Sequence, residues 1–264
     1  MRAVRFYAPG DVRLEATSIP PAGPGELVAQ CAVTLTCGTD VKMYKRGHRL
    51  IHPPQIIGHE FAGVVTEVGK GVKEFSPGMH VVAANSAPCN ACFYCINRQP
   101  NLCEHLDDVL LGFSWPGSYA EYVRIPERIV RQNTFQIPNN VKMEHVASLE
   151  PLACVVHGWD LVNLRPAGTA VVIGGGPIGL LHLQLASLHA AKRIVLCDVV
   201  DQRLEEAKKI LEAQANPRFA EDLVRECVRR FPNALFVNGR CFESIHAHDA
   251  IATWSSKPGW MPVL

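Results

Sequence analysis

The sequence has no excess of either charge and no long uninterrupted hydrophobic run. Its 264 residues include 26 lysines and arginines and 25 aspartates and glutamates, which gives a formal net charge of +1. This balance does not indicate a nucleic-acid partner or an acidic membrane surface. The N-terminal stretch, MRAVRFYAPGDVRLE, lacks the apolar core of a secretory signal. Glycines and a proline interrupt the longest apolar stretch, residues 169–186, so we expect no membrane span.

Internal repeats and low-complexity segments are also lacking. Hydrophobic residues make up 48% of the chain and charged residues 19%, a composition that argues against disorder. The length is sufficient for two domains. Because we see no export signal, we expect a cytoplasmic protein whose thiols stay reduced. The ten cysteines are then not expected to form a disulfide framework.

Four of the cysteines lie in a single loop, CNACFYCINRQPNLC. Short spacings let a tight turn direct neighbouring thiolates at one ion, and four thiolates make the closed tetrahedral shell of a structural zinc site. An iron–sulfur cluster uses the same ligand type, and the same cysteines could instead form disulfides or stay unliganded. We expect a structural zinc ion, whose ligands are Cys89, Cys92, Cys95 and Cys103.

A second candidate metal site combines residues that are far apart in the sequence. The stretch TCGTD supplies Cys37, IGHEFAG supplies His59 and Glu60, and SLEPLACVVHG supplies Glu150. A carboxylate in an apolar segment is costly to bury without a partner. Cysteine, histidine and glutamate make three protein ligands with an open fourth position, the composition of a catalytic zinc site. Separately, Cys37 and His59 are equally compatible with ordinary buried packing, and Glu150 with an acid at a helix start.

The stretch GTAVVIGGGPIGLLHLQLASLHAAKRIVLCD predicts a dinucleotide-binding unit. We expect a buried strand at residues 170–173, a helix at 178–191 and a second strand at 193–197. The motif G-x-G-x-x-G lies between the first strand and the helix. Asp198 follows the second strand, 19 residues after the last glycine.

Each part of this motif has a physical role in holding a dinucleotide. The glycines allow a tight turn, close approach of the pyrophosphate to backbone N–H groups, and close packing of helix on strand. Asp198 would accept hydrogen bonds from the ribose and repel a 2′-phosphate, which favours NAD over NADP; the alternative is that it caps the next helix. Arg203 is close enough to the adenine side to allow some NADP tolerance. The candidate cofactor-binding residues are Gly174, Gly176, Pro177, Ile178, Gly179, Asp198 and Arg203.

Taken in order, these motifs resemble the zinc-containing medium-chain dehydrogenases, the family of alcohol, sorbitol and threonine dehydrogenases. The shared patterns are CG[ST]D, GHE, the four-cysteine loop, GxGxxG and the acid at the strand end, and they extend to about Leu211. The EPL sequence at Glu150 resembles the sorbitol and threonine branch. The resemblance implies an α/β fold with a β-rich part: a GroES-like catalytic domain at residues 1–150, then an incomplete Rossmann domain at residues 151–264.

The resemblance also implies a zinc-dependent transfer of hydride from a secondary alcohol, a polyol or an amino alcohol, to NAD. Cys37 and His59 would hold the catalytic zinc, and Glu150 lies where alcohol dehydrogenases proper carry a cysteine. Glu60 would orient the metal shell or exchange into it, and Thr39 would pass the substrate proton onward. One catalytic and one structural zinc ion, a small alcohol substrate and a homo-oligomer are expected.

The sequence departs from the family pattern at two places. Lys42 stands where many relatives have a histidine that serves proton transfer, and His48 and His52 are the nearby substitutes. Only about three strand–helix units fit between Thr169 and Leu264, fewer than a full dinucleotide fold needs. We therefore expect a shortened dinucleotide domain. The alternative function is a truncated, catalytically inactive product that binds zinc, with or without a nucleotide.

Overall fold

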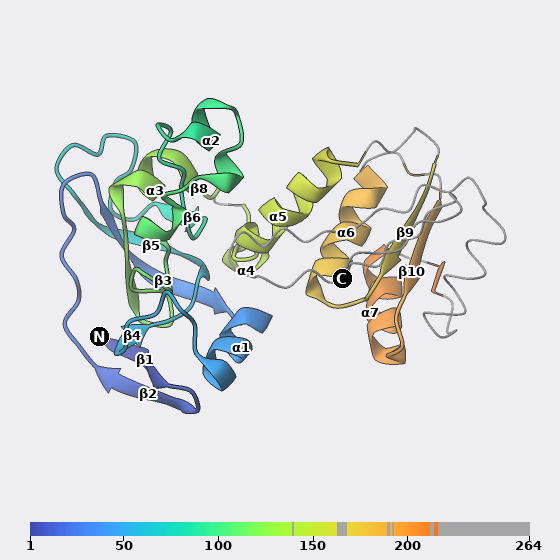
Figure 1. Cartoon of the computed structure of the whole chain (residues 1–264), viewed down its shortest axis with the longest axis horizontal. Coiled ribbons are helices and arrows are strands. Elements are labelled where there is room, and N and C mark those ends of the chain that lie inside the picture. The colour runs from blue at the N-terminus through green and yellow to red at the C-terminus, as the bar shows by residue number, and fades with distance from the viewer. Residues whose placement is uncertain (139, 163–167, 189–190, 192, 212–213, 216–264) are drawn as a thin grey trace. The chain divides into compact units, whose positions relative to one another are not determined.

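The chain forms two compact units, Met1–Glu150 and Pro151–Leu264. The computed structural model describes residues 1–138, 140–162, 168–188, 191, 193–211 and 214–215 (Figure 1). The first unit is rich in strands, and the second alternates strands and helices. This is the expected α/β fold with a β-rich part, and the prediction of the fold class is confirmed.

A five-stranded antiparallel sheet is the centre of the first unit. Its strand order is β7-β3-β5-β6-β8, and its longest ladder joins β3 to β5. In that ladder Leu35, the last residue of β3, pairs with Glu60, the first residue of β5. The end of one long strand therefore lies beside the start of the other. The strands are β3 (Leu27–Leu35), β5 (Glu60–Val68), β6 (His80–Ala83), β7 (Tyr122–Ile125) and β8 (Thr134–Gln136).

A smaller antiparallel sheet, in the order β2-β1-β4, completes the strands described in this unit. It consists of β1 (Arg2–Ala8), β2 (Asp11–Ala16) and β4 (Gln55–Ile56). Short helices lie in the connections between the strands. They are α1 (Gly38–Arg46), α2 (Phe93–Ile96), η1 (Pro100–Leu102), η2 (Leu106–Val109), α3 (Glu127–Asn133) and α4 (Met143–Val146), and α5 (Leu149–Asp160) leads into the second unit.

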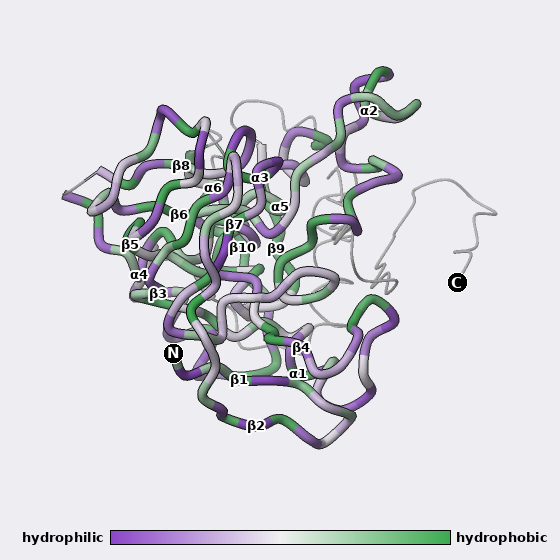
Figure 2. The backbone as a smooth tube through the Cα atoms, turned by 90° about the vertical axis from the view of Figure 1, so that its left-hand side faces the viewer, coloured by the Kyte–Doolittle hydropathy of each residue, from purple (hydrophilic) through white to green (hydrophobic). Residues whose placement is uncertain are grey.

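Aliphatic and aromatic side chains of the five-stranded sheet form the core of the first unit. Leu27, Phe61 and Ile125 are completely buried on three neighbouring strands. Figure 2 shows α2 on a lobe that extends away from these strands, and hydrophobic residues lie on it. Phe93 and Ile96, both on α2, are 67% and 71% exposed. The apolar core therefore does not hold this lobe, which needs another source of order.

The second unit contains the expected strand–helix–strand succession. Strand β9 (Thr169–Ile173) is followed by α6 (Pro177–Leu188), and β10 (Arg193–Cys197) lies parallel to β9. Helix α7 (Asp201–Leu211) leads to the short parallel strand β11 (Gln214–Ala215), so the sheet order is β11-β10-β9. Val172, Leu183, Leu196, Leu204 and Ala207 form a core between this sheet and its helices. Further expected elements after residue 215 lie outside the described residues.

Among the described residues, no helix is both long and apolar enough to cross a lipid bilayer.

The buried leucine of β3 provides a test of this core. We expect Leu27→Ala to lower the free energy of unfolding by about 2 to 5 kcal/mol, because it leaves a cavity in close-packed surroundings. Leu14→Ala in β2 is the matched control, since Leu14 is 68% exposed. Urea unfolding followed by circular dichroism measures both. Equal losses in the two variants would contradict the position of the core.

Candidate metal and nucleotide sites

The first site lies where β3 ends and β5 begins. Cys37 precedes α1, and His59 and Glu60 enter β5, so the pairing of the two strands brings all three together. One ligand atom from each residue lies within 4.8 Å of the others. His59 and Glu60 are 2% and 6% exposed, and Nε2 of His59 is 3.9 Å from Oε1 of Glu60. Sulfur, nitrogen and carboxylate oxygen within this distance are a donor set that suits a zinc ion.

Asp40 lies behind His59, on the side away from Glu60. Its Oδ1 atom is 3.4 Å from Nδ1 of His59, and its Oδ2 atom accepts a hydrogen bond from the backbone N–H of Cys37 at 2.8 Å. Nδ1 of His59 therefore faces Asp40, and Nε2 lies on the side of Glu60. A carboxylate behind a histidine is a common second layer of metal sites.

The electrostatics of this cluster favour a cation. Burial lowers the pKa of His59, but its contacts with Asp40 and Cys37 outweigh burial and raise it to about 10. Burial raises the pKa of the Glu60 carboxyl. A divalent cation held among these residues would neutralise the same buried acidic groups.

Glu150 lies outside the group formed by Cys37, His59 and Glu60 but within its electrostatic range. Burial raises the pKa of the Glu150 carboxyl, and the charges of His59 and Glu60 also act on it. Its Oε1 atom accepts a hydrogen bond at 3.2 Å from Nδ2 of Asn85, which is 3% exposed. Glu60 is therefore the nearer carboxylate of the two.

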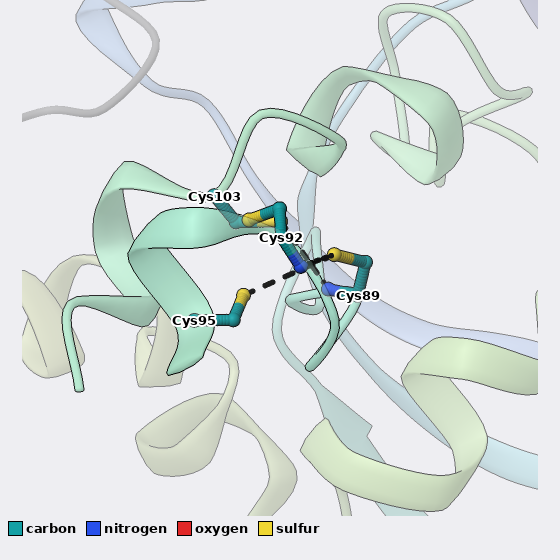
Figure 3. Close-up of side chains that lie close together, drawn as sticks. All are labelled: Cys89, Cys92, Cys95 and Cys103. Carbon is teal, nitrogen blue, oxygen red and sulfur yellow. Dashed lines mark hydrogen bonds between the residues drawn. The ribbon is translucent and has the colours of Figure 1, made fainter. Parts of the chain in front are cut away.

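The second site is the four-cysteine loop that surrounds α2. The sulfur atoms of Cys89, Cys92, Cys95 and Cys103 all lie within 4.8 Å of one another. Figure 3 shows the four side chains converging on one point. The four residues are free thiols, so disulfides do not explain the loop. Backbone N–H groups donate to two of these sulfurs: Cys89 to Cys103 at 3.2 Å, and Cys92 to Cys89 at 3.3 Å. These contacts suit thiolates that bind a metal.

The third site is the glycine loop between β9 and α6. Gly174 has a φ of +98°, and a Cβ on Gly179 would overlap the carbonyl of Gly174. By contrast, no described atom lies within 4 Å of a Cβ placed on Gly176, so the space above this glycine is open. Pro177 starts the helix, where its missing N–H costs nothing. The loop thus offers room for a phosphate group at a helix N-terminus.

Asp198 connects the end of β10 to this loop. Its Oδ2 atom accepts a hydrogen bond from the backbone N–H of Gly175 at 2.6 Å, and Arg203 lies 3.3 Å from the same oxygen. Oδ1 accepts from the backbone N–H of Val200 at 2.8 Å. Burial raises the pKa of Asp198, but these donors outweigh it and hold the pKa below its usual value. Asp198 therefore stays ionised beside the glycine loop.

Comparison with known proteins shows which families and proteins the chain resembles. A profile of the alcohol dehydrogenase GroES-like domain matches residues 23–139. L-threonine 3-dehydrogenase of Pyrococcus horikoshii is 34% identical over 86% of this chain and 64% of its own length. Sorbitol dehydrogenase of Bombyx mori is 31% identical over 79% of this chain and 59% of its own.

Solved structures give the same result. The alcohol dehydrogenase of Thermus sp. ATN1 is 30% identical, with a TM-score of 0.76 over 88% of this chain and 68% of that chain. The chain belongs to the zinc-containing medium-chain alcohol dehydrogenases. A zinc-binding dehydrogenase of Sinorhizobium meliloti 1021, bound to NADP, is 34% identical with a TM-score of 0.75, over 81% of this chain and 60% of that chain.

The match to these dehydrogenases covers only part of the length of each relative. The chain spans 64% and 59% of the two curated dehydrogenases named above. A second profile, that of the type I GTP cyclohydrolase folE2, matches residues 187–252. Most of this second match lies outside the described residues, in the region where we expected the dehydrogenase pattern to end.

Two residues beside the first site were not predicted as functional groups. Asp40 stands three residues after Cys37, at the spacing of a helix capping box, and this was the available signal. Asn85, the partner of Glu150, precedes the cysteine loop and carries no motif of its own. Its role depends on a contact across 65 residues of sequence, which no local pattern reveals.

The cysteine loop generates a metal-content prediction. We expect Cys95→Ser to remove one zinc ion per chain and to loosen the exposed lobe, because the thiolate shell is then incomplete. Cys31→Ala is the matched control, since burial raises the pKa of Cys31 to about 12 and keeps it a neutral thiol. Elemental analysis of dialysed protein measures the zinc. The same zinc content in both variants would contradict the assignment.

Asp198 generates a prediction on acid stability. Because its pKa is lowered in the folded chain, its stabilising effect is present above its unfolded value of 3.8 and is lost as pH falls through the folded value. We expect Asp198→Asn to cost about 1 to 3 kcal/mol at neutral pH and less near pH 3.

Urea unfolding at several pH values tests this, with Asp160→Asn as the control. Asp160 ends α5 and is exposed, so its loss is expected to change stability little at any pH. A cost for Asp198→Asn that does not depend on pH would show that its charge is unimportant.

Proposed function

We propose that the chain is a zinc-dependent oxidoreductase that transfers a hydride from a secondary alcohol to NAD. The observation that carries this proposal is the cluster of half-buried Cys37 with buried His59 and Glu60, with Asp40 behind the histidine. A sulfur, a nitrogen and a carboxylate leave an open coordination position, which a closed structural site lacks. Zinc bound there would act as a Lewis acid that lowers the pKa of a substrate hydroxyl.

The residues of the chain have separate tasks in this proposal. Cys37 and His59 hold the ion, and Glu60 or Glu150 supplies the carboxylate. Both carboxyls have raised pKa values through burial, so a nearby cation is what would keep them ionised. The ring of Phe113 lies 5.4 Å from that of His59 and is completely buried, so it shields one side of the histidine from water.

Thr39 is the proposed group for moving the substrate proton. It is 3% exposed and lies on α1, two residues after Cys37. A hydroxyl both donates and accepts, so it can pass a proton from a substrate hydroxyl to a further acceptor. Its position on the same short segment as a metal ligand supports this role.

The dinucleotide is proposed to bind at the glycine loop of the second unit. The open space above Gly176 would take the pyrophosphate, and the ionised Asp198 would accept the ribose hydroxyls. A negative charge at this place repels a 2′-phosphate and favours NAD. Arg203 contacts Asp198 and could partly offset that repulsion, and the Sinorhizobium meliloti relative is bound to NADP.

The substrate class is proposed from the relatives and from the branch-specific sequence at Glu150. The matched curated dehydrogenases are named for threonine and sorbitol, an amino alcohol and a polyol. We therefore propose a polyol or an amino alcohol as the substrate. In the same proposal residues 1–150 are the GroES-like catalytic domain, with one catalytic and one structural zinc. Residues 151–264 are the nucleotide domain of a cytoplasmic homo-oligomer.

Zinc content, NAD binding and turnover measured on one preparation test this function. We expect two zinc ions per chain, saturable NAD binding by calorimetry, and NADH formation with members of a polyol and amino-alcohol panel. We expect His59→Ala to reduce NADH formation by about 100-fold or more, because the ion loses a ligand. The matched control is His145→Ala, since His145 is exposed on α4.

The alternative function predicts a different result in the same experiment. A catalytically inactive product would bind zinc, with or without NAD, but form no NADH with any substrate. A chain with one zinc ion and no NAD binding would contradict the oxidoreductase and fit this alternative, because only the cysteine loop would then be assembled.

A further inference from the structure

The segment 117–119 lies against residues 56–58, which lead into His59 and Glu60 at the start of β5. Its three backbone N–H groups donate to the carbonyls of residues 56–58 at 2.8, 2.9 and 2.9 Å. The two segments are about sixty residues apart in sequence, yet they are joined as tightly as neighbouring strands. The backbone that leads into the metal ligands is therefore held from one side by this segment.

Glycines allow this close approach. Gly58, next to His59, has a φ of +93°, and a Cβ there would lie 2.7 Å from Cγ of Tyr119. A Cβ on Gly117 would overlap the carbonyl of Gly58 and lie 2.6 Å from Cα of Gly112. The ring of Tyr119 thus packs directly on the backbone beside a metal ligand, where only glycine leaves room for it.

The hydroxyl of Tyr119 reaches the group behind the histidine. It donates to Oδ2 of Asp40 at 2.7 Å, while Oδ1 of the same carboxylate faces Nδ1 of His59 at 3.4 Å. Burial raises the pKa of Tyr119, and the Asp40 carboxylate raises it further, so the hydroxyl keeps its proton and remains a donor. With the N–H of Cys37 on the same oxygen, the carboxylate has two donors that fix its rotation.

The same segment also supports the backbone of the second ligand. Ser118 is completely buried, and its hydroxyl lies 3.1 Å from that of Thr34. Thr34 in turn donates to the carbonyl of Glu60 at 3.0 Å. Side chains from one short segment are therefore connected to both His59 and Glu60.

We propose that Tyr119 is a positioning residue of the metal site: its hydroxyl holds Asp40 so that His59 presents Nε2 to the ion. This rests on the proposed function, because it assumes a metal at Cys37, His59 and Glu60. Partners in the second layer of a metal site typically change metal affinity about 10- to 100-fold when they are removed. In this scheme Tyr119 acts on the metal ligands through Asp40.

Tyr119→Phe removes the hydroxyl and keeps the ring that packs on Gly58. We expect zinc at the Cys37 site to be held about 10-fold more weakly or worse, while the cysteine loop keeps its ion at full affinity. Competition with a chromophoric chelator on the full chain measures both affinities. The visible spectrum of the cobalt(II)-loaded chain is expected to change as well, because the geometry around the ion changes. The matched control is Tyr7→Phe, since Tyr7 also donates to a carboxylate, Glu15, at 2.8 Å.

A double-mutant cycle with Asp40→Asn shows whether the hydroxyl acts through Asp40. In that background Tyr119→Phe is expected to have no further effect on zinc affinity. Unchanged affinity and an unchanged cobalt spectrum in Tyr119→Phe would overturn the proposal, and so would loss of both zinc ions, which would indicate a packing role only. If the unaltered chain held no ion at Cys37, the proposed function itself would fail instead.

Discussion

The contact between Asp40 and His59 is the interaction on which the proposed metal site depends. Both side chains are almost fully buried, and their facing atoms are 3.4 Å apart. Removing one member of a buried pair leaves the other uncompensated, which typically costs about 3 to 5 kcal/mol. The surrounding structure is organised to keep this pair in place: the N–H of Cys37 and the hydroxyl of Tyr119 both donate to the carboxylate. These two donors limit the rotation of the carboxylate that faces His59.

The two long strands of the first unit make this pairing possible. Their register brings the end of β3 next to the start of β5, so a cysteine that follows one strand meets a histidine and a glutamate that enter the other. The cysteine loop follows a different principle. Its apolar residues Phe93 and Ile96 remain exposed, so a core does not supply its order. In the proposed function its four thiolates and a bound ion supply that order instead.

Much of the fold and of the candidate sites could be predicted from the sequence. The residues that were missed have one cause in common: their roles depend on contacts between distant segments. The strands and the helix around the glycine loop follow from local periodicity, and the structure confirms them at residues 169–173, 177–188 and 193–197. The helix was predicted to extend to residue 191, which the structure leaves outside a helix. The grouping of Cys37 with His59 was suggested by residue type and by the family resemblance. Tyr119 and Asn85 were not predicted, because their roles arise from contacts between distant segments. The relative distance of Glu60 and Glu150 from the other ligands likewise depends on three-dimensional packing that no local pattern records.

Diffraction at the zinc absorption edge, from crystals of the full chain grown with zinc and NAD, tests the central claim most directly. We predict one anomalous peak among Cys37, His59 and a carboxylate, and a second among the four cysteines of the loop. We also predict that Asp40 stays within hydrogen-bond distance of Nδ1 of His59 when the ion is bound. A single peak in the cysteine loop, with His59 turned away from Cys37, would contradict the claim.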